Sequence, residues 1–318
     1  MRYLLFFILF SNLLLAKPFS PESLDDVIFT LEANTAESKQ ISLLLQQIEK
    51  EPSNLEAVDQ LLSLYIKLGK SKADTSYLGY AKAFLAPYLL KYPNAYGLTL
   101  HQVDILQHTH HFDEALHLLK SLTAKNIKAL EPYLMTAIIY QAKEDYVASL
   151  SACKKLLFRS SHLISATCLS FSQSYLGKLP SSYALLQDVY AKAKKEDQHE
   201  KSWALTSLAD MAYRLEKKEA SLAYLKEALA LDVKDYFVLK KMSELYLEQK
   251  KYEKVKVLLA PYEYVDALLL RLTVAKEKLG EEVGLAKENL KSLLKTLKLS
   301  GESPHKEDLP YFKMLGIK

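Results

Sequence analysis

A repeat of about 34 residues runs through most of this chain of 318 residues. Its marker is a small or β-branched residue, which recurs at intervals of 34, 34, 33, 39 and 34 residues as Ala81, Ala115, Ser149, Ser182, Ser221 and Val255. Four residues after each marker stands an apolar residue, at Leu85, Leu119, Cys153, Leu186, Leu225 and Leu259. A fixed period of this length is typical of chains built from stacked copies of one small unit.

The spacing of four residues indicates helices, because two such positions lie one turn apart on the same helical face. We therefore expect two amphipathic helices in each unit, with the small residue allowing the second helix to approach the first closely. One pair of helices cannot bury its apolar face alone, so neighbouring units must stack into a continuous core. The predicted fold is all-α, a right-handed superhelical solenoid without a β-sheet.

The unit resembles the tetratricopeptide repeat (TPR). The clearest copy is MSELYLEQKKYEKVKVLLAPY, residues 242–262, and FDEALHLLKSL from Phe112 carries the same pattern. Proteins of this family often have Gly in the turn between the two helices, and here Gly is expected there only as Gly69, Gly177 and Gly280. The resemblance implies a stack of divergent TPR-like helix pairs.

The repeats define the predicted organisation of the chain. Seven repeats are expected over residues 55–299, with boundaries at 55–95, 96–129, 130–162, 163–201, 202–235, 236–265 and 266–299. Residues 17–54 precede them as a leading segment, with one or two helices expected over 22–51. Residues 300–318 form a C-terminal tail or cap, for which helix and extended chain are both open.

The first sixteen residues have the layout of a secretory signal peptide. Arg2 supplies a positive charge, the stretch from Leu4 to Leu15 is mostly apolar, and Ala16 precedes the expected cleavage point. A helix needs about 20 apolar residues to cross a membrane, so this stretch is too short to span one comfortably. We expect export after cleavage, and the alternative is an uncleaved anchor.

Three further segments are similar to a group of exported bacterial TPR proteins of uncharacterised role. They are YIKLGKSKADTSYLGYAKAFLAPY (65–88), WALTSLADMAYRL (203–215) and PHKEDLPYFKMLG (304–316). This resemblance implies export, and a periplasmic location if the source is a Gram-negative bacterium. It implies no particular activity.

The sequence contains no motif that indicates catalysis. It contains only 8 glycines, no GxSxG or HExxH motif and no phosphate-binding loop. The acidic pairs Asp25–Asp26 and Glu281–Glu282 lie on polar stretches and are expected as helix N-terminal charges. We predict that the chain is not an enzyme and needs no cofactor. Without residues 1–16, which include Arg2, the formal charge falls from +4 to +3, and this is too small and dispersed for a nucleic-acid surface. No later segment predicts a membrane span.

The two cysteines fall on either side of one predicted turn. Cys153 is expected late in the second helix of one repeat, and Cys168 early in the first helix of the next, so that they lie at the same level of a helical hairpin. Because export permits disulfides, we predict a structural disulfide between them. Two buried free thiols are the alternative, and the lack of a CxxC motif argues against redox catalysis.

Five of the eight histidines lie within seventeen residues of the second repeat. They are His101, His108, His110, His111 and His117. Imidazole is a common ligand of zinc, copper and nickel, so a metal site is one hypothesis for this cluster. Solvated helix and turn residues are the simpler interpretation.

Aromatic residues are predicted on the concave face of the repeats. In the TPR resemblance, residues 2, 5, 9 and 12 of each first helix line this face. This places Phe171, Trp203, Tyr213, Phe237 and Lys240 in one stretch of groove, with Arg214 beside them. Trp and Tyr are frequent binding anchors, so the groove is expected to hold an extended peptide or a partner helix. The alternative is that these rings pack between helices.

These observations favour a non-enzymatic scaffold that binds a protein or peptide in the bacterial cell envelope. A metal-handling envelope protein using the cluster from His101 to His117 is the second hypothesis. An accessory subunit that acts only within an enzyme complex is the third.

Overall fold

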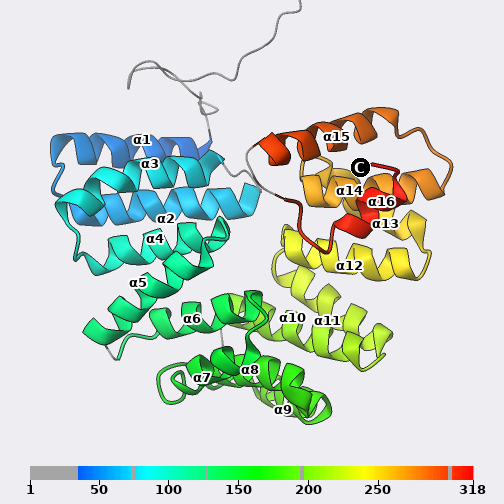
Figure 1. Ribbon diagram of the computed structural model, residues 1–318, viewed down its shortest axis with the longest axis horizontal. Coiled ribbons are helices and arrows are strands. Elements are labelled where there is room, and N and C mark those ends of the chain that lie inside the picture. The colour runs from blue at the N-terminus through cyan, green and yellow to red at the C-terminus, as the bar shows by residue number, and fades with distance from the viewer. Residues whose placement is uncertain (1–34, 73–75, 127, 194–196, 300–302, 318) are drawn as a thin grey trace, which may run out of the picture. The chain divides into compact units, whose positions relative to one another are not determined.

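A computed structural model describes residues 35–72, 76–126, 128–193, 197–299 and 303–317, and every regular element in these ranges is helical (Figure 1). The expected signal peptide, residues 1–16, lies outside the described residues. Within them, no helix combines the length and the apolar character needed to cross a membrane.

The chain divides into two compact units, of which the first ends at Val58 and the second begins at Asp59. In the first unit, helix α1 (Ala36–Lys50) begins at Thr35, whose Oγ1 accepts a hydrogen bond from the Ser38 backbone N–H at 3.1 Å. This is a typical N-cap, which satisfies an otherwise unpaired donor. Helix α2 (Leu55–Lys72) runs across the division between the units.

The remaining helices occur in pairs. In each pair the second helix follows the first after a short turn. The first three pairs are α2 with α3 (Ser76–Lys91), α4 (Tyr96–His108) with α5 (Phe112–Lys125), and α6 (Glu131–Ala142) with α7 (Tyr146–Lys154). The other four are α8 (His162–Gln173) with α9 (Leu179–Lys192), α10 (Gln198–Arg214) with α11 (Lys218–Leu231), α12 (Tyr236–Glu248) with α13 (Tyr252–Leu259), and α14 (Asp266–Lys278) with α15 (Gly284–Leu299). The short segment η1 (Ser174–Lys178) joins α8 to α9, and a second one, η2 (Ala260–Tyr262), follows α13. Helix α8 begins one residue before the repeat boundary expected at 163, and α10 begins four residues before the one expected at 202.

The small residues that mark the repeat are buried, as close packing within a pair requires. The markers Ala81, Ala115, Ser149, Ser182, Ser221 and Val255 are all buried, and so are the apolar residues four positions later. In α11, Ser221 Oγ donates a hydrogen bond to the Ala209 carbonyl of α10 at 2.8 Å. A larger side chain at this point would push the two helices apart.

The turns between the paired helices use a left-handed residue. Non-glycine residues with positive φ occupy this place in four pairs, at His110, Glu144, Glu216 and Lys250, while Gly177 and Gly280 occupy it in two others. The next residue then donates to a carbonyl five positions back, as in Lys217 N to Ala212 O at 2.9 Å. This is the Schellman ending of a helix, which favours glycine at the left-handed position. Gly69, expected in such a turn, lies within α2 instead.

The C-terminal tail forms a short helix, α16 (Leu309–Met314), in the part that the structure describes. Phe312, Leu315 and Ile317 are buried in one apolar cluster with residues of α14 and α15. The tail therefore covers the apolar face that the last helix pair would otherwise expose, as terminal capping elements do in repeat proteins (Figure 1).

Candidate functional site

A cavity of about 780 Å³ opens in the second unit among the first helices of successive pairs. Its walls come from α6, α8, α10, α12 and α14, with additional residues from α11, α13 and the tail helix α16. Its size suits a few side chains of a bound peptide.

Four aromatic rings predicted for a groove all line this cavity: Phe171 of α8, Trp203 and Tyr213 of α10, and Phe237 of α12. The helix α10 also contributes Thr206 and Asp210, so all four of its positions 203, 206, 210 and 213 reach the cavity. These positions are three and four residues apart and therefore share one helical face. The structure thus brings together rings that are 66 residues apart in sequence.

The four rings differ in their exposure to solvent, and therefore in how accessible they are to a ligand. Phe237 is 53% exposed and Tyr213 is 43% exposed. Trp203 is half-buried and packs against the cluster that contains Cys153, Cys168 and Leu156. Phe237 and Tyr213 are therefore available anchors, whereas Trp203 also belongs to the core.

Arg214, predicted in the groove, does not line the cavity. Its guanidinium lies 3.8 Å from the centroid of the Tyr175 ring, and its Nε donates to Asp210 at 2.9 Å. It also donates to the backbone carbonyl of Ser174 at 3.3 Å. The Tyr175 ring stacks in turn on Tyr146, with centroids 4.0 Å apart. The guanidinium of Arg214 is thus held in a structural stack between repeats.

Lys240 does not line the cavity either, and the adjacent Lys241 does. Both lysines form ion pairs with Glu307, which precedes the tail helix. Burial alone would raise the pKa of Glu307, but the hydrogen bond and charge of Lys240, with the charge of Lys241, lower it to about 2. The tail is thus held to α12 by charge as well as by its apolar residues.

The acidic groups of the lining each have a partner. Asp210 pairs with Arg214, and Glu248 accepts from Lys218 at 2.6 Å. Glu244 accepts from both Lys241 and Arg271 at 3.1 Å. Lys278, at the exposed end of α14, lines the cavity and forms no ion pair with any described residue. The lining therefore presents one unmatched positive charge beside its aromatic rings.

Two tyrosine hydroxyls of the cavity, those of Tyr213 and Tyr311, have a raised pKa. Burial, followed by the charge of Glu248, raises the pKa of Tyr213. Burial and the charge of Glu244 raise the pKa of Tyr311 to about 12, although Arg271 opposes them. These hydroxyls can donate hydrogen bonds to a ligand, but neither is tuned for proton transfer near neutral pH.

The tail helix contributes Tyr311 and Met314 to the lining, and no part of the tail was predicted there. The sequence carried a signal for the helix itself, since Leu309, Phe312 and Leu315 recur at helical spacing. The sequence carried no signal for the position at which the tail packs against the repeats, because that contact joins segments outside the repeat register.

Four histidines of the second repeat, His101, His108, His110 and His111, each have a different partner. His101 Nε2 lies 2.8 Å from Asp59 Oδ1, and His108 Nε2 lies 3.4 Å from Asp104 Oδ1. His111 Nδ1 lies 3.0 Å from Thr109 Oγ1, while the His110 ring contacts the ring of Phe112. Among the described residues, no group of three or more His, Cys, Asp or Glu is placed to hold a metal ion. The hypothesis of a metal site gains no support.

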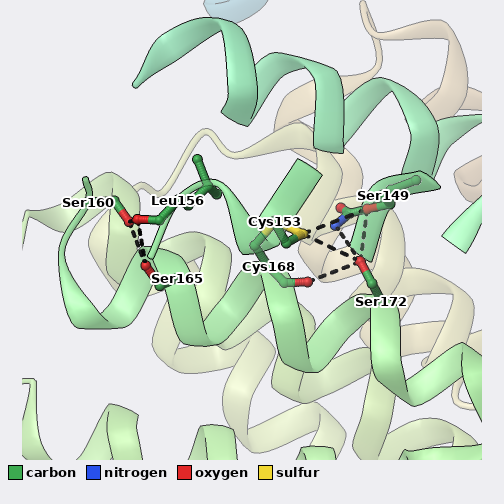
Figure 2. Close-up of a disulfide and its surroundings, with 8 residues drawn as sticks. Ser149, Cys153, Leu156, Ser160, Ser165, Cys168 and Ser172 are labelled. Atoms are coloured by element: carbon green, nitrogen blue, oxygen red, sulfur yellow. Dashed lines mark hydrogen bonds between the residues drawn. A yellow bond between two sulfur atoms is a disulfide. The ribbon is translucent and has the colours of Figure 1, made fainter. Parts of the chain in front are cut away.

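The predicted cysteine pair forms a disulfide, Cys153–Cys168, with the sulfur atoms 2.00 Å apart (Figure 2). It joins α7 to α8 and therefore links two successive repeats. Ser172 Oγ lies 2.8 Å from Ser149 Oγ and donates to the Cys168 carbonyl at 3.1 Å, so the bond is enclosed by satisfied hydroxyls.

Comparisons with known proteins identify the fold and nothing finer. No family model and no curated protein sequence matches the chain. A chain in the crystal structure of the APC/C hetero-tetramer Cut9-Hcn1 aligns with a TM-score of 0.52 at 14% identity, over 86% of this chain and 51% of that one. This chain thus spans about half the length of that match.

Two bacterial structures are similar at lower scores. A tetratricopeptide repeat protein from Parabacteroides merdae aligns with a TM-score of 0.47 at 15% identity, over 80% of this chain and 98% of that one. TTC0263, a TPR protein of Thermus thermophilus, aligns with a TM-score of 0.42 at 17% identity, over 67% and 100%. The helix pairs of the structure and the match at a TM-score of 0.52 confirm the predicted all-α solenoid of TPR-like helix pairs.

Proposed function

We propose that this TPR-like solenoid is a non-enzymatic scaffold that binds a protein or peptide partner in the cavity of its first helices. The observation that carries the proposal is the convergence of Phe171, Trp203, Tyr213 and Phe237 from three successive repeats on one open cavity. Large aromatic rings on a rigid frame bind with little loss of conformational entropy, and this makes them effective anchors.

The chemistry of the lining defines the partner that it suits. An apolar or aromatic side chain of the partner would lie between Tyr213 and Phe237, which are the most exposed of the four rings. A carboxylate would neutralise Lys278, since the acids of the lining already have internal partners. The proposed ligand is therefore an extended peptide or partner segment that carries both an apolar and an acidic side chain.

We place this activity in the cell envelope of a bacterium. Two observations support this location: the signal-like residues 1–16 and the disulfide Cys153–Cys168. Structural disulfides persist in oxidising compartments and are rare in the bacterial cytosol. Expression of the full chain in a Gram-negative host, followed by osmotic-shock fractionation and intact-mass analysis, tests it. We expect mature protein in the periplasmic fraction without residues 1–16, and full-length protein in the cytosol would contradict it.

Crosslinked capture from envelope fractions tests the binding surface. We expect Tyr213→Ala and Phe237→Ala each to reduce recovery of a specific partner at least tenfold, as hot-spot residues do. Lys278→Glu should also weaken capture, because it places a like charge opposite the carboxylate of the partner. Leu285→Ser serves as the matched control, since Leu285 is exposed and lies outside the cavity.

Two results would contradict the proposal. If the cavity variants and the control retain the same partners as the unmodified protein, binding uses another surface. If Tyr213→Ala and Phe237→Ala unfold, as judged by circular dichroism, the rings belong to the core and not to a binding site.

A further inference from the structure

The turn between α7 and α8 presents an apolar tip to solvent. Phe158 is fully exposed, and Leu157 beside it is also exposed. Phe158 adopts a left-handed backbone conformation with φ of 64°, which costs a bulky residue free energy. An aromatic residue held outward in such a conformation gains nothing from packing within the chain.

The surrounding structure holds this tip in place. Leu156, two residues before Phe158, is completely buried, and its carbonyl accepts from Ser165 Oγ at 3.3 Å (Figure 2). The same carbonyl accepts from Arg159 N at 2.9 Å. Ser165 Oγ also lies 2.7 Å from Ser160 Oγ. The disulfide Cys153–Cys168 ties the helix before the turn to the helix after it. The exposure of Phe158 is therefore a property of a braced hairpin.

Three basic residues lie within four positions of Phe158 in the sequence. Lys154, Lys155 and Arg159 are all exposed, and none of them forms an ion pair with a described residue. Arg159 donates to the Lys155 carbonyl at 2.8 Å and lies 5.7 Å from the centroid of the Tyr133 ring, but it remains exposed. The sequence from Tyr146 to Gln187 contains no Asp or Glu. The nearby Glu200 of α10 accepts a hydrogen bond from Ser161 Oγ at 2.6 Å, and this partly satisfies its charge.

From this arrangement we infer that the α7–α8 turn is a contact site for an anionic lipid surface. Phe158 and Leu157 would enter the interfacial region, while Lys154, Lys155 and Arg159 meet acidic headgroups. Aromatic residues favour the membrane–water interface, and basic residues beside them add attraction to anionic lipids. The inference is independent of the proposed partner cavity, which this turn does not line.

A lipid surface fits this tip better than a folded protein does. A specific protein–protein interface buries about 1,200–2,000 Å² in total, and two adjacent apolar side chains offer only a small part of that area. Insertion into a bilayer needs no complementary pocket. It requires only an apolar tip with basic residues beside it, and the turn has both.

Sedimentation with lipid vesicles tests the inference on the mature chain, with its disulfide intact. The vesicles are phosphatidylcholine alone, or equal parts of phosphatidylcholine and phosphatidylglycerol. We expect binding to the mixed vesicles only, weakened by added salt because headgroup attraction is screened. Phe158→Ser should reduce binding about tenfold. The triple variant Lys154→Gln, Lys155→Gln and Arg159→Gln should reduce it about a hundredfold.

Matched controls separate the tip from general effects. Leu285→Ser removes another exposed apolar side chain, which lies between Glu282 and Glu288 in sequence. A second triple variant, Lys120→Gln, Lys226→Gln and Lys295→Gln, removes the same number of charges from three separate helices. Both controls should bind mixed vesicles within about twofold of the unmodified chain, because neither changes the turn.

A fluorescence measurement supports the sedimentation assay directly. With Trp203→Phe as background, Phe158→Trp leaves one indole at the tip, and its emission should shift to shorter wavelength on mixed vesicles. Three results would overturn the inference: equal binding to neutral vesicles, equal losses in the controls, or no emission shift. Loss of protein capture by Phe158→Ser without loss of vesicle binding would assign the tip to a protein partner and also overturn it.

Discussion

Arg271 Nη2 lies 2.8 Å from Asp308 Oδ1, and the Arg271 side chain is completely buried. Its Nε donates to Glu244 at 3.1 Å, so carboxylates from α12 and from the tail share one buried guanidinium. Burial alone would lower the pKa of Arg271, but the charges of Glu244 and Asp308 raise it above its usual value. The tail therefore completes the charge balance of the last repeats and forms part of the fold.

Substitution of Asp308 should destabilise the protein markedly. Asp308→Ala leaves buried Arg271 with one carboxylate, and we expect the free energy of unfolding to fall by about 3 kcal/mol. Urea denaturation followed by circular dichroism measures the change. Asp188→Ala breaks an exposed pair with Lys192 and should cost less than about 1 kcal/mol. Equal losses for the two variants would show that the buried pair adds nothing.

Glu307 should make stability depend on acid pH. Its pKa is lowered from 4.5 to about 2, so its ion pairs with Lys240 and Lys241 stabilise the fold above pH 4.5 and are lost as pH falls through 2. The carboxylate is 45% exposed, and screening limits its contribution to about 1 kcal/mol. We expect Glu307→Gln to be less stable than the unmodified protein at pH 7.

The same comparison at several pH values checks the sign of this effect. The difference in unfolding free energy between Glu307→Gln and the unmodified protein should shrink between pH 4.5 and pH 2, where the native carboxylate becomes protonated. A difference that stays constant over this range, or grows, would show that the charge of Glu307 does not stabilise the fold.

Much of the fold was predictable because the positions that recur in the repeat are those where paired helices pack most closely. Ala81, Ser149 and Ser221 mark the closest approach of paired helices, and such positions exclude large side chains at any point in the stack. The same register predicted the lining of the cavity at Trp203 and Tyr213. Local spacing on one helix face determines both results.

The errors arose where contacts join segments outside this register. Lys240 was predicted in the groove, but Glu307 of the tail holds it, and Lys241 lines the cavity instead. Arg214 was also predicted there, yet the stack on Tyr175 holds its guanidinium. The partners of charged side chains come from segments that are distant in sequence, and helical periodicity alone carries no information about those partners.

Glycine substitutions in the turns between paired helices should stabilise the protein. Glu144, Glu216 and Lys250 have φ between 56° and 60°, a conformation that costs an L-residue about 1–2 kcal/mol. Glycine avoids this strain but loses about 0.5–1 kcal/mol of backbone entropy. We expect each single glycine variant to gain up to about 1 kcal/mol and the triple variant to melt at a higher temperature.

The reverse substitution provides the control for the turns. Gly177 has φ of 82° in the segment between α8 and α9, so Gly177→Ala should lower the stability by about 1 kcal/mol. If the three glycine variants lower the melting temperature while Gly177→Ala leaves it unchanged, strain at the left-handed positions does not govern these turns.

Trp203 and Phe237 should differ sharply in their effect on stability. Trp203 packs against the cluster around Cys153 and Cys168, so Trp203→Ala should cost about 3 kcal/mol. Phe237 is 53% exposed, and Phe237→Ala should change the unfolding free energy by less than about 1 kcal/mol. Thermal and urea unfolding measure both. A large loss for Phe237→Ala would move this ring from the cavity wall into the core.

The disulfide Cys153–Cys168 should contribute measurably to stability, because it closes a loop of 15 residues. A crosslink over such a loop stabilises by about 3 kcal/mol in the chain-entropy model. We therefore expect the double variant Cys153→Ser, Cys168→Ser to lose about that amount in urea unfolding under oxidising conditions. Under reducing conditions the unmodified protein should approach the double variant. A thiol count on the denatured, unreduced protein should find no free cysteine, and two free thiols would show that the bond does not form.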